Sequence, residues 1–271
     1  MTLDPADAAQ LERLLRRHRI TLQHRLGQNF LVDPAIRDRI AAEAGVSADD
    51  EVLEVGAGVG TLTIALAARA RHVRAVELDR SLFAALREVV GDRPNVELIA
   101  GDILRLNVTG EIVVGNIPYN LTGALIRKLL DHAPRPKRLS LVVQKEVAQR
   151  WTAPTSASLS TVAVQVFAVP RLVFTIPASA FTPEPRVDSA LVILEVRPKP
   201  AVEVDDMDRF FRFVESVFQL RRKQLGGILS RQGTGQDVLN QVGIDPKRRP
   251  QTLTLPEWEN LFRAVNRGHD R

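Results

Sequence analysis

The chain has 271 residues, of which 45% are hydrophobic and 25% charged, and its formal net charge is +5. This balance is that of a folded globular protein with one large domain, or with one large and one small domain. Because the chain has no cysteine, disulfides, thiolate metal sites and cysteine nucleophiles are excluded.

The N-terminal part of the chain has the patterns of two helices separated by an irregular stretch. Residues 5–19 form a basic helical pattern with leucines on one face. The stretch "RLGQNFL" at 25–31 is predicted to be irregular. Asp33 then suits the cap of a second helix, Pro34 suits its first turn, and Gly45 suits its end.

From residue 51 onward, short apolar runs alternate with helical patterns. The runs typical of buried strands lie at 51–55, 72–78, 95–103, 111–116 and 138–144. The helical patterns between them lie at 61–70, 80–90 and 121–130. This alternation predicts βαβ units and a parallel sheet. Ligands of such sheets bind beyond the carboxyl ends of the strands.

After residue 144 the pattern changes toward helices and proline-rich loops. A helix is expected at 145–151, followed by a loop at 152–158, strands at 171–176 and 190–196, and a proline-containing linker. Four helical segments follow, at 207–218, 221–231, 236–243 and 255–265. We therefore predict a main domain at 1–197, with an N-terminal helical extension, and a small helical domain at 198–271 on the substrate side.

The residues at three strand ends together describe a site for an adenosine. Gly56 and Gly58, in the turn "GAGVG", allow the backbone to approach a ligand closely. Glu77 ends the second strand, where an acid can accept both ribose hydroxyls. Asp102 follows the third strand and can accept from the adenine amine, while Ile103 can cover the ring. The turn lacks the third glycine of a dinucleotide fingerprint, which favours S-adenosylmethionine over NAD, although a purely structural turn stays an alternative.

The stretch "GNIPYN" at 115–120 follows the fourth strand and combines two acceptors with an aromatic ring. The amide oxygen of Asn116 and a carbonyl fixed by Pro118 can both accept from one amino group. Tyr119 can stack on a base. Two accepted hydrogen bonds favour a tetrahedral nitrogen whose lone pair can attack a methyl group, so this chemistry depends on alignment and electrostatics. A proline turn with a half-buried tyrosine is the structural alternative.

Seven motifs occur in the order found in one enzyme family: "LGQNFL", "VLEVGAGVGTLT", "VELD", "GDIL", "GNIPYN", "VVQKEVAQR" and "AFTPEPRVDSALV". The sequence resembles the ribosomal RNA adenine N6-dimethyltransferases, which include the KsgA and Erm types. The resemblance covers roughly residues 10–265. It implies a Rossmann-like, S-adenosylmethionine-dependent methyltransferase domain with a mostly parallel seven-stranded sheet, followed by a small C-terminal helical domain.

The resemblance also implies roles for individual residues. Those that would contact S-adenosylmethionine are Gln28, Asn29, Leu31, Gly56, Gly58, Glu77, Leu78, Asp102, Ile103 and Asn116. Those that would hold the target adenine are Asn116, Pro118, Tyr119 and Phe181, with Tyr119 and Phe181 on opposite faces of the base. An adenine held in this way must be unstacked or lie in a loop.

The C-terminal motifs "VFQLRRKQLGGIL" and "RRPQTLTLPEWENLF" are similar to the KsgA type. The implied substrate is the small-subunit (16S) rRNA, as RNA or in a pre-30S particle, with two adjacent adenosines in the 3′-terminal hairpin loop as targets. Basic residues that could contact phosphates are Arg221, Arg222, Lys223, Arg248 and Arg249. The loop at 152–160 lacks the Gly, Lys, Tyr and Arg residues usual in that type, which puts RNA docking there in doubt.

The net charge, the spacing of the histidines and the lengths of the apolar runs give further expectations. The modest basic excess fits a polyanionic partner. The five histidines have no ligand-like spacing, so we expect no metal. Without a signal-peptide core or an apolar run of about 18–20 residues, we expect a cytoplasmic monomer that does not contact membranes.

Three alternatives stay open at this point. The first is an Erm-type enzyme that acts on large-subunit (23S) rRNA. The second is an NAD-dependent oxidoreductase, against which the missing glycine and the residues of "NIPY" count. The third is a ribosome-assembly factor with little catalysis, which the altered loop at 152–160 would favour.

Overall fold

The computed structural model describes residues 3–21, 28–118, 121–130, 134–232 and 237–267. The chain divides into two compact units, one of residues Met1–Ala148 with Pro170–Val196 and the other of Gln149–Val169 with Arg197–Arg271. The expected boundary at 197/198 lies next to one crossing between these units. Residues 149–169 belong to the second unit, however, which the sequence did not indicate.

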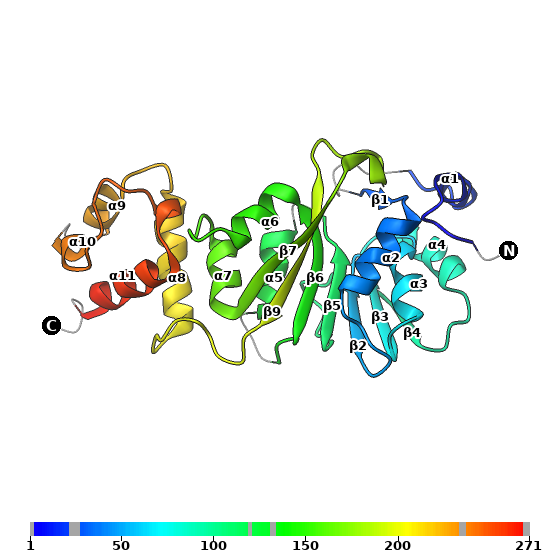
Figure 1. The fold of residues 1–271 in the computed structure, drawn as a ribbon, viewed down its shortest axis with the longest axis horizontal. Coiled ribbons are helices and arrows are strands. Elements are labelled where there is room, and N and C mark those ends of the chain that lie inside the picture. The colour runs from blue at the N-terminus through cyan, green and yellow to red at the C-terminus, as the bar shows by residue number, and fades with distance from the viewer. Residues whose placement is uncertain (1–2, 22–27, 119–120, 131–133, 233–236, 268–271) are drawn as a thin grey trace. The chain divides into compact units, whose positions relative to one another are not determined.

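A seven-stranded sheet forms the centre of the first unit in the described part of the chain, in the order β4-β3-β2-β5-β6-β9-β7 (Figure 1). Its strands are β2 (Glu51–Val55), β3 (His72–Glu77), β4 (Val96–Ala100), β5 (Ile112–Asn116), β6 (Arg138–Gln144), β7 (Ala168–Ile176) and β9 (Ser189–Val196). Strands β4 to β6 run parallel, whereas β9 pairs antiparallel with β6. The prediction of a mostly parallel seven-stranded sheet is confirmed.

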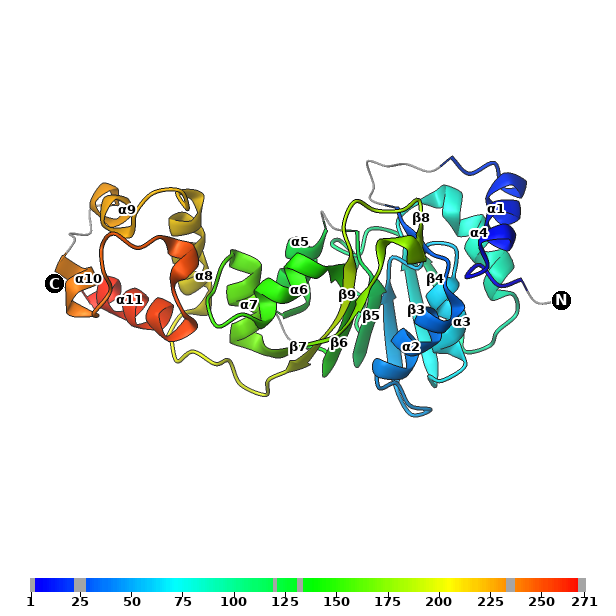
Figure 2. The same ribbon diagram turned by 45° about the horizontal axis from the view of Figure 1, so that its top comes forward.

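Helices α2 (Pro34–Glu43), α3 (Thr61–Ala67) and α4 (Arg80–Val90) cover one face of this sheet (Figure 2). Their buried residues share a core with every second residue of the strands, including Val52, Ala75 and Val114. The N-terminal helix α1 (Ala8–Arg17) packs its leucines against α4. Each fully buried leucine contributes about 1.5–3 kcal/mol. Helix α5 (Thr122–Leu130) follows β5 in the chain.

A second, two-stranded sheet lies where the parallel strands of the first sheet have their carboxyl ends. Strand β1 (Phe30–Leu31) pairs antiparallel with β8 (Phe181–Thr182), so that Leu31 lies opposite Phe181. The sequence predicted an irregular segment at 25–31, because two paired residues are too few to show a period of two. This pairing joins residues 30–31 to Phe181, which was expected to hold the target base.

The second unit is helical and has an aromatic core. It contains α7 (Leu159–Phe167), α8 (Met207–Gln219), α9 (Leu225–Arg231), α10 (Asp237–Gln241) and α11 (Leu255–Arg267), together with the last turn of α6 (Lys145–Thr152). Rings of α8 and α11 pack edge-to-face or tilted against one another at centroid distances of 5.2–6.2 Å, namely Phe210, Phe213, Phe218, Trp258 and Phe262. Helix α7 was not predicted, because its sequence "LSTVAVQVF" is buried on nearly every side and shows no polar face.

The atypical loop after α6 is a packed part of the second unit. The N–H of Ser156 donates to the carbonyl of Leu253 at 2.7 Å, and Thr155 forms a β-bridge with Thr254. Trp151 and Ser156 are buried. The missing cations of this loop are thus replaced by residues that hold the unit together.

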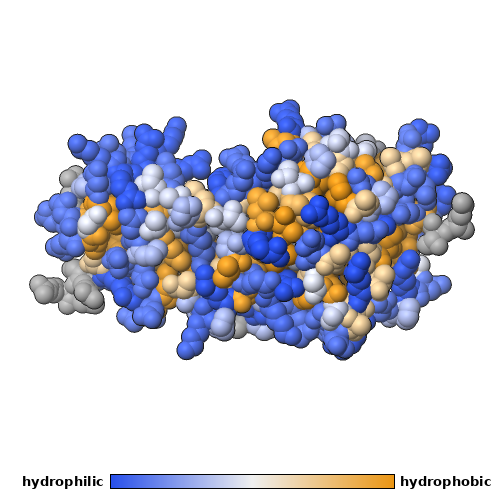
Figure 3. All heavy atoms as spheres, in the orientation of Figure 1, coloured by the Kyte–Doolittle hydropathy of each residue, from blue (hydrophilic) through white to orange (hydrophobic). Residues whose placement is uncertain are grey.

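The described helices include none that is both long and apolar enough to cross a membrane. On the face shown in Figure 3, hydrophobic residues gather over β7. There the guanidinium of Arg39 lies 3.9 Å from the ring centroid of Phe174 and covers part of this apolar surface.

Candidate active site

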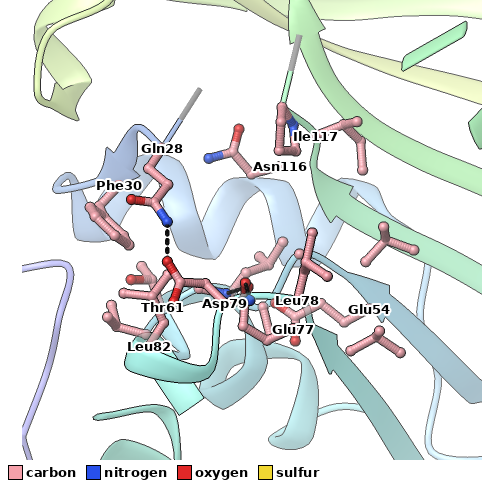
Figure 4. A pocket seen from close by; sticks show the side chains of 18 of the residues that line it. Gln28, Phe30, Glu54, Thr61, Glu77, Leu78, Asp79, Leu82, Asn116 and Ile117 are labelled. Atoms are coloured by element: carbon pink, nitrogen blue, oxygen red, sulfur yellow. Dashed lines mark hydrogen bonds between the residues drawn. The ribbon is translucent and has the colours of Figure 1, made fainter. Parts of the chain in front are cut away.

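A cavity of about 200 Å³ lies at the carboxyl ends of β2, β3 and β5 (Figure 4). Its lining includes every predicted cofactor or base residue that the structure describes: Gln28, Asn29, Leu31, Gly56, Gly58, Glu77, Leu78, Asp102, Ile103, Asn116, Pro118 and Phe181. Tyr119 lies outside the described residues. The sheet thus brings together residues that are more than 150 positions apart in the sequence.

Several N–H groups of the glycine turn between β2 and α3 already donate hydrogen bonds to other residues of the chain. Gly56 and Gly58 have φ angles of +73° and +59°, which side chains rarely adopt. The N–H groups of Gly56 and Ala57 donate to the carbonyl of Val76, and the N–H of Gly58 donates to Glu77. A pyrophosphate needs free N–H donors at such a turn, so these contacts favour an adenosine that is held by its sugar.

The carboxylate of Glu77 lies at the centre of the cavity wall and has acceptor capacity left. Its Oε2 accepts from the N–H of Gly58 at 2.7 Å, and its Oε1 accepts from the N–H of Asp79 at 2.8 Å. Each oxygen keeps a lone pair for a second donor. Burial raises the pKa of Glu77, while these two hydrogen bonds act in the opposite direction. A carboxylate so held fits the two neighbouring hydroxyls of a ribose.

Asp102 and its neighbours form the end of the cavity beyond β4. Oδ1 of Asp102 accepts from the N–H of Leu104 at 2.9 Å, which orients the carboxylate. Ile103 is buried, whereas Leu78 is 58% exposed although it is a large apolar residue. An acceptor in a cavity that two aliphatic side chains also line suits an adenine ring with its amine. The donors and acceptors of this wall therefore fit the nucleoside part of S-adenosylmethionine.

The amide of Asn116 is held in one orientation at the end of β5. Its Nδ2 donates to the backbone carbonyl of Asn29 at 3.0 Å, so its Oδ1 is the atom available as an acceptor. The carbonyl of Pro118 accepts from the N–H of Leu121 at 2.9 Å and keeps one lone pair. Both residues line the cavity, and the role that the sequence predicted for these two neutral acceptors stays a prediction.

Gly115 explains why the strand can end in this way. A Cβ at this position would lie 2.6 Å from the carbonyl oxygen of Val55 and 2.6 Å from Cδ1 of Ile117. Glycine therefore lets β5 lie close to β2 at the point where Asn116 leaves the sheet.

The comparisons with known proteins agree on one family. The family described as ribosomal RNA adenine dimethylase matches residues 19–266. The chain belongs to this family. Ribosomal RNA small subunit methyltransferase A of Pelotomaculum thermopropionicum is 41% identical, over 94% of this chain and 95% of its own length. Its counterpart in Moorella thermoacetica is 40% identical, over 88% and 91%.

Solved structures agree with this assignment. The crystal structure of the 23S rRNA methyltransferase ErmE matches with a TM-score of 0.68 and 31% identity, over 88% of this chain and all of that one. A dimethyladenosine transferase from Plasmodium falciparum matches with a TM-score of 0.72 and 25% identity, over 88% and 97%. This adenine dimethylase is thus an S-adenosylmethionine-dependent rRNA methyltransferase with a Rossmann-like fold.

Several cavity residues of the adenine dimethylase were missed by sequence reasoning. Phe30 lies beside Gly58, where an added Cβ would lie 3.4 Å from its ring. Glu54 on β2 is 1% exposed, and its Oε2 has no hydrogen-bond partner among the described residues. Burial raises the pKa of Glu54 to about 8, with a further contribution from the charge of Glu77. An acid within the apolar run "EVLEV" was the signal that could have identified it.

The predicted RNA-binding residues have different environments. Arg221, Arg222 and Lys223 are exposed in a turn, and α9 begins only at Leu225, so the predicted helix start at 221 was wrong. Bonds of the turn type, such as that from the N–H of Lys223 to the carbonyl of Leu220, replace helical bonds there.

The two arginines of the second basic run also differ. Both Nη atoms of Arg248 donate to the carboxylate of Glu257, at 2.5 and 3.1 Å, whereas Arg249 is exposed. The guanidinium of Arg248 is thus engaged within the second unit. No group of three His, Asp or Glu side chains that could hold a metal occurs in the described part of the chain.

Proposed function

We propose that this protein dimethylates N6 of two adjacent adenosines in the 3′-terminal hairpin loop of small-subunit rRNA. The observation that carries the proposal is the position of Asn116 and Pro118 in the same cavity as Glu77 and Asp102. The groups that would accept from a base amine thus line the same cavity as the residues that would hold S-adenosylmethionine. The relatives named small subunit methyltransferase A, at 40–41% identity, support the choice of subunit.

Residues of the cavity would hold the cofactor by its nucleoside. Glu77 would accept from the ribose hydroxyls, Asp102 from the adenine amine, and Leu78 and Ile103 would cover the ring. Gln28, Asn29 and Leu31 would border the methionine part. When bound, the cofactor supplies an electrophilic methyl group on a sulfonium sulfur.

The target amine would be held by two acceptors. Oδ1 of Asn116 and the carbonyl of Pro118 would each accept one N–H bond. Because the lone pair of an adenine amine is delocalised into the ring, these contacts favour the tetrahedral nitrogen that can attack. Neither acceptor is a charged base, so the proposed rate enhancement comes from alignment and electrostatics.

An adenine would enter this position only when it is unstacked from its neighbours. Phe181 is buried at the cavity edge, where β8 holds it against β1. Phe181 and Tyr119 would cover opposite faces of the base, each contributing about 1–3 kcal/mol by stacking. A hairpin loop supplies such a base at low cost.

Phosphates of the rRNA would contact a basic groove of the second unit. A hollow of about 310 Å³ is lined by Arg222, Lys223, Arg231 and Gly227. A Cβ at Gly227 would meet nothing within 4 Å, so glycine leaves this hollow open. Arg221 and Arg249 are also exposed and would add to the basic surface, whereas Arg248 would act within the unit.

The proposed partner is the small-subunit rRNA in a pre-30S particle, and we propose that the enzyme acts as a monomer in the cytoplasm. Large-subunit rRNA is the second candidate substrate, because the structure of the 23S rRNA methyltransferase ErmE matches the fold at 31% identity. An assembly factor with little catalysis is the third candidate.

One experiment separates these candidates. Unmethylated small and large ribosomal subunits are incubated separately with the protein and S-adenosylmethionine labelled on its methyl group. We expect label in small-subunit rRNA alone. Label in large-subunit rRNA alone would refute the proposed substrate, and no label in either subunit would favour the assembly factor.

A further inference from the structure

Residues 28–32, which we call the N-terminal segment, contact several walls of the cavity. Gln28 donates to Asp79 in the loop between β3 and α4, at 2.8 Å from Nε2 to Oδ2 (Figure 4). Asn29 accepts from the amide of Asn116 at 3.0 Å. Leu31 pairs with Phe181, and the N–H of Val32 donates to the carbonyl of Ala180 at 2.8 Å.

Asp79 divides its contacts between three elements. Its Oδ1 accepts from the N–H and the hydroxyl of Ser81, at 2.8 and 2.6 Å, and so caps α4. Its own N–H donates to Oε1 of Glu77 at 2.8 Å, and its Oδ2 accepts from Gln28. Although burial alone would raise the pKa of Asp79, the hydrogen bonds from Ser81 and Gln28 bring the pKa below its ordinary value. The bond from Gln28 therefore ends on a charged oxygen, which strengthens it.

We propose that Asp79 is a positioning residue for methyl transfer. It holds Gln28, and thereby keeps the N-terminal segment where the carbonyl of Asn29 orients the amide of Asn116. This inference rests on the proposed function, because it assigns the Oδ1 of Asn116 to the target amine. It adds a residue whose side chain contacts neither the ribose nor the base in that proposal.

The consequence is a link between the two halves of the cavity. The Asp79 backbone contacts the acid that would hold the ribose, and its side chain holds the segment that would border the methionine part. If the Gln28–Asp79 bond is lost, the segment loses a tie to the nucleoside side. We therefore expect faster release of the cofactor and a less well oriented Asn116.

The test uses variants that separate helix capping from the bond to Gln28. Serine is a good helix cap but has a single side-chain oxygen, so Asp79→Ser keeps the cap of α4 and loses the acceptor for Gln28. Ser81→Ala is the matched control, because it removes a contact of the other carboxylate oxygen. Binding of S-adenosylhomocysteine is measured by calorimetry on the full chain, together with the thermal midpoint.

We expect Asp79→Ser to weaken binding of S-adenosylhomocysteine about tenfold, the size expected for loss of a hydrogen bond to a charged group. Turnover with saturating S-adenosylmethionine should fall several-fold, and the thermal midpoint should stay close to that of the parent. Ser81→Ala should bind within about twofold of the parent. Parent-like binding by Asp79→Ser would overturn the inference.

A swapped pair distinguishes positioning from direct contact with the cofactor. Gln28→Glu places two carboxylates together and should weaken binding more than tenfold. Adding Asp79→Asn restores the hydrogen bond with donor and acceptor exchanged. Binding of S-adenosylhomocysteine should then return to within about threefold of the parent. No rescue by the double variant would contradict a role through Gln28. Since S-adenosylhomocysteine binding requires no RNA, this test stands even if the proposed rRNA substrate is wrong.

Discussion

Glu54 should make the stability of this protein depend on pH, and Glu54→Gln should remove the contribution of this residue. The side chain is 1% exposed and lies between Ala75 and Val114 in the sheet register. Burial raises its pKa from 4.5 to about 8. A carboxyl whose pKa is higher in the folded state stabilises the fold below its unfolded pKa, and this stabilisation is lost as the pH rises through the folded pKa.

The magnitude follows from the size of the pKa shift. Each pH unit between about 4.5 and about 8 should remove about 1.4 kcal/mol from the free energy of unfolding. Over the whole interval the loss is on the order of 5 kcal/mol. Glutamine has a similar volume but does not titrate. A pH-independent effect of the substitution shifts the free energy of unfolding equally at every pH, so the slope against pH reports the titration of Glu54.

The assay is urea denaturation of both proteins between pH 5 and pH 9. We expect the free energy of unfolding of Glu54→Gln, relative to the parent, to increase steadily up to about pH 8 and then level off. Parallel pH profiles for the two proteins would refute the reasoning, because they would mean that Glu54 has an ordinary pKa in the folded state.

Three further changes test other parts of the structure. Glu77→Ala should weaken binding of S-adenosylhomocysteine, measured by calorimetry, by more than tenfold, because the carboxylate proposed to accept from both ribose hydroxyls is removed. An unchanged affinity would mean that the ribose contact is misassigned. Gly115→Ala should lower the free energy of unfolding by about 1–3 kcal/mol, since the added Cβ would lie 2.6 Å from a backbone oxygen. Gly123→Ala is the matched control, because a Cβ at that position would meet nothing within 4 Å. Arg19→Gly should raise the free energy of unfolding by about 1 kcal/mol, because Arg19 has a φ of 52° just after α1, and urea denaturation that shows a loss would contradict this.

Much of the first unit could be predicted from the sequence because its signals are local. The run 51–55 and the pattern 80–90 match β2 and α4 in their bounds. Glu77, Asp102 and Asn116 stood out because polar residues followed apolar runs at the ends of predicted parallel strands. Parallel strands place such ends on one edge, and the structure brings these residues into one cavity.

The parts that the sequence did not show depend on contacts between distant residues. Gln28 and Asp79 are 51 positions apart, and nothing in either motif indicates that they form a hydrogen bond. The engagement of Arg248 by Glu257 likewise depends on the fold of the second unit. Helix α7 lacks a polar face because it is buried on nearly every side, so its period was hidden.

The central claim is that the amide of Asn116 serves the methylation of an adenine amine on small-subunit rRNA. The most direct measurement is mass spectrometry of nucleosides from unmethylated small subunits treated with S-adenosylmethionine and either the parent protein or Asn116→Ala. We predict N6,N6-dimethyladenosine with the parent and almost none with Asn116→Ala, while that variant still binds S-adenosylhomocysteine. Equal amounts of dimethyladenosine with both proteins, or none with the parent, would contradict the claim.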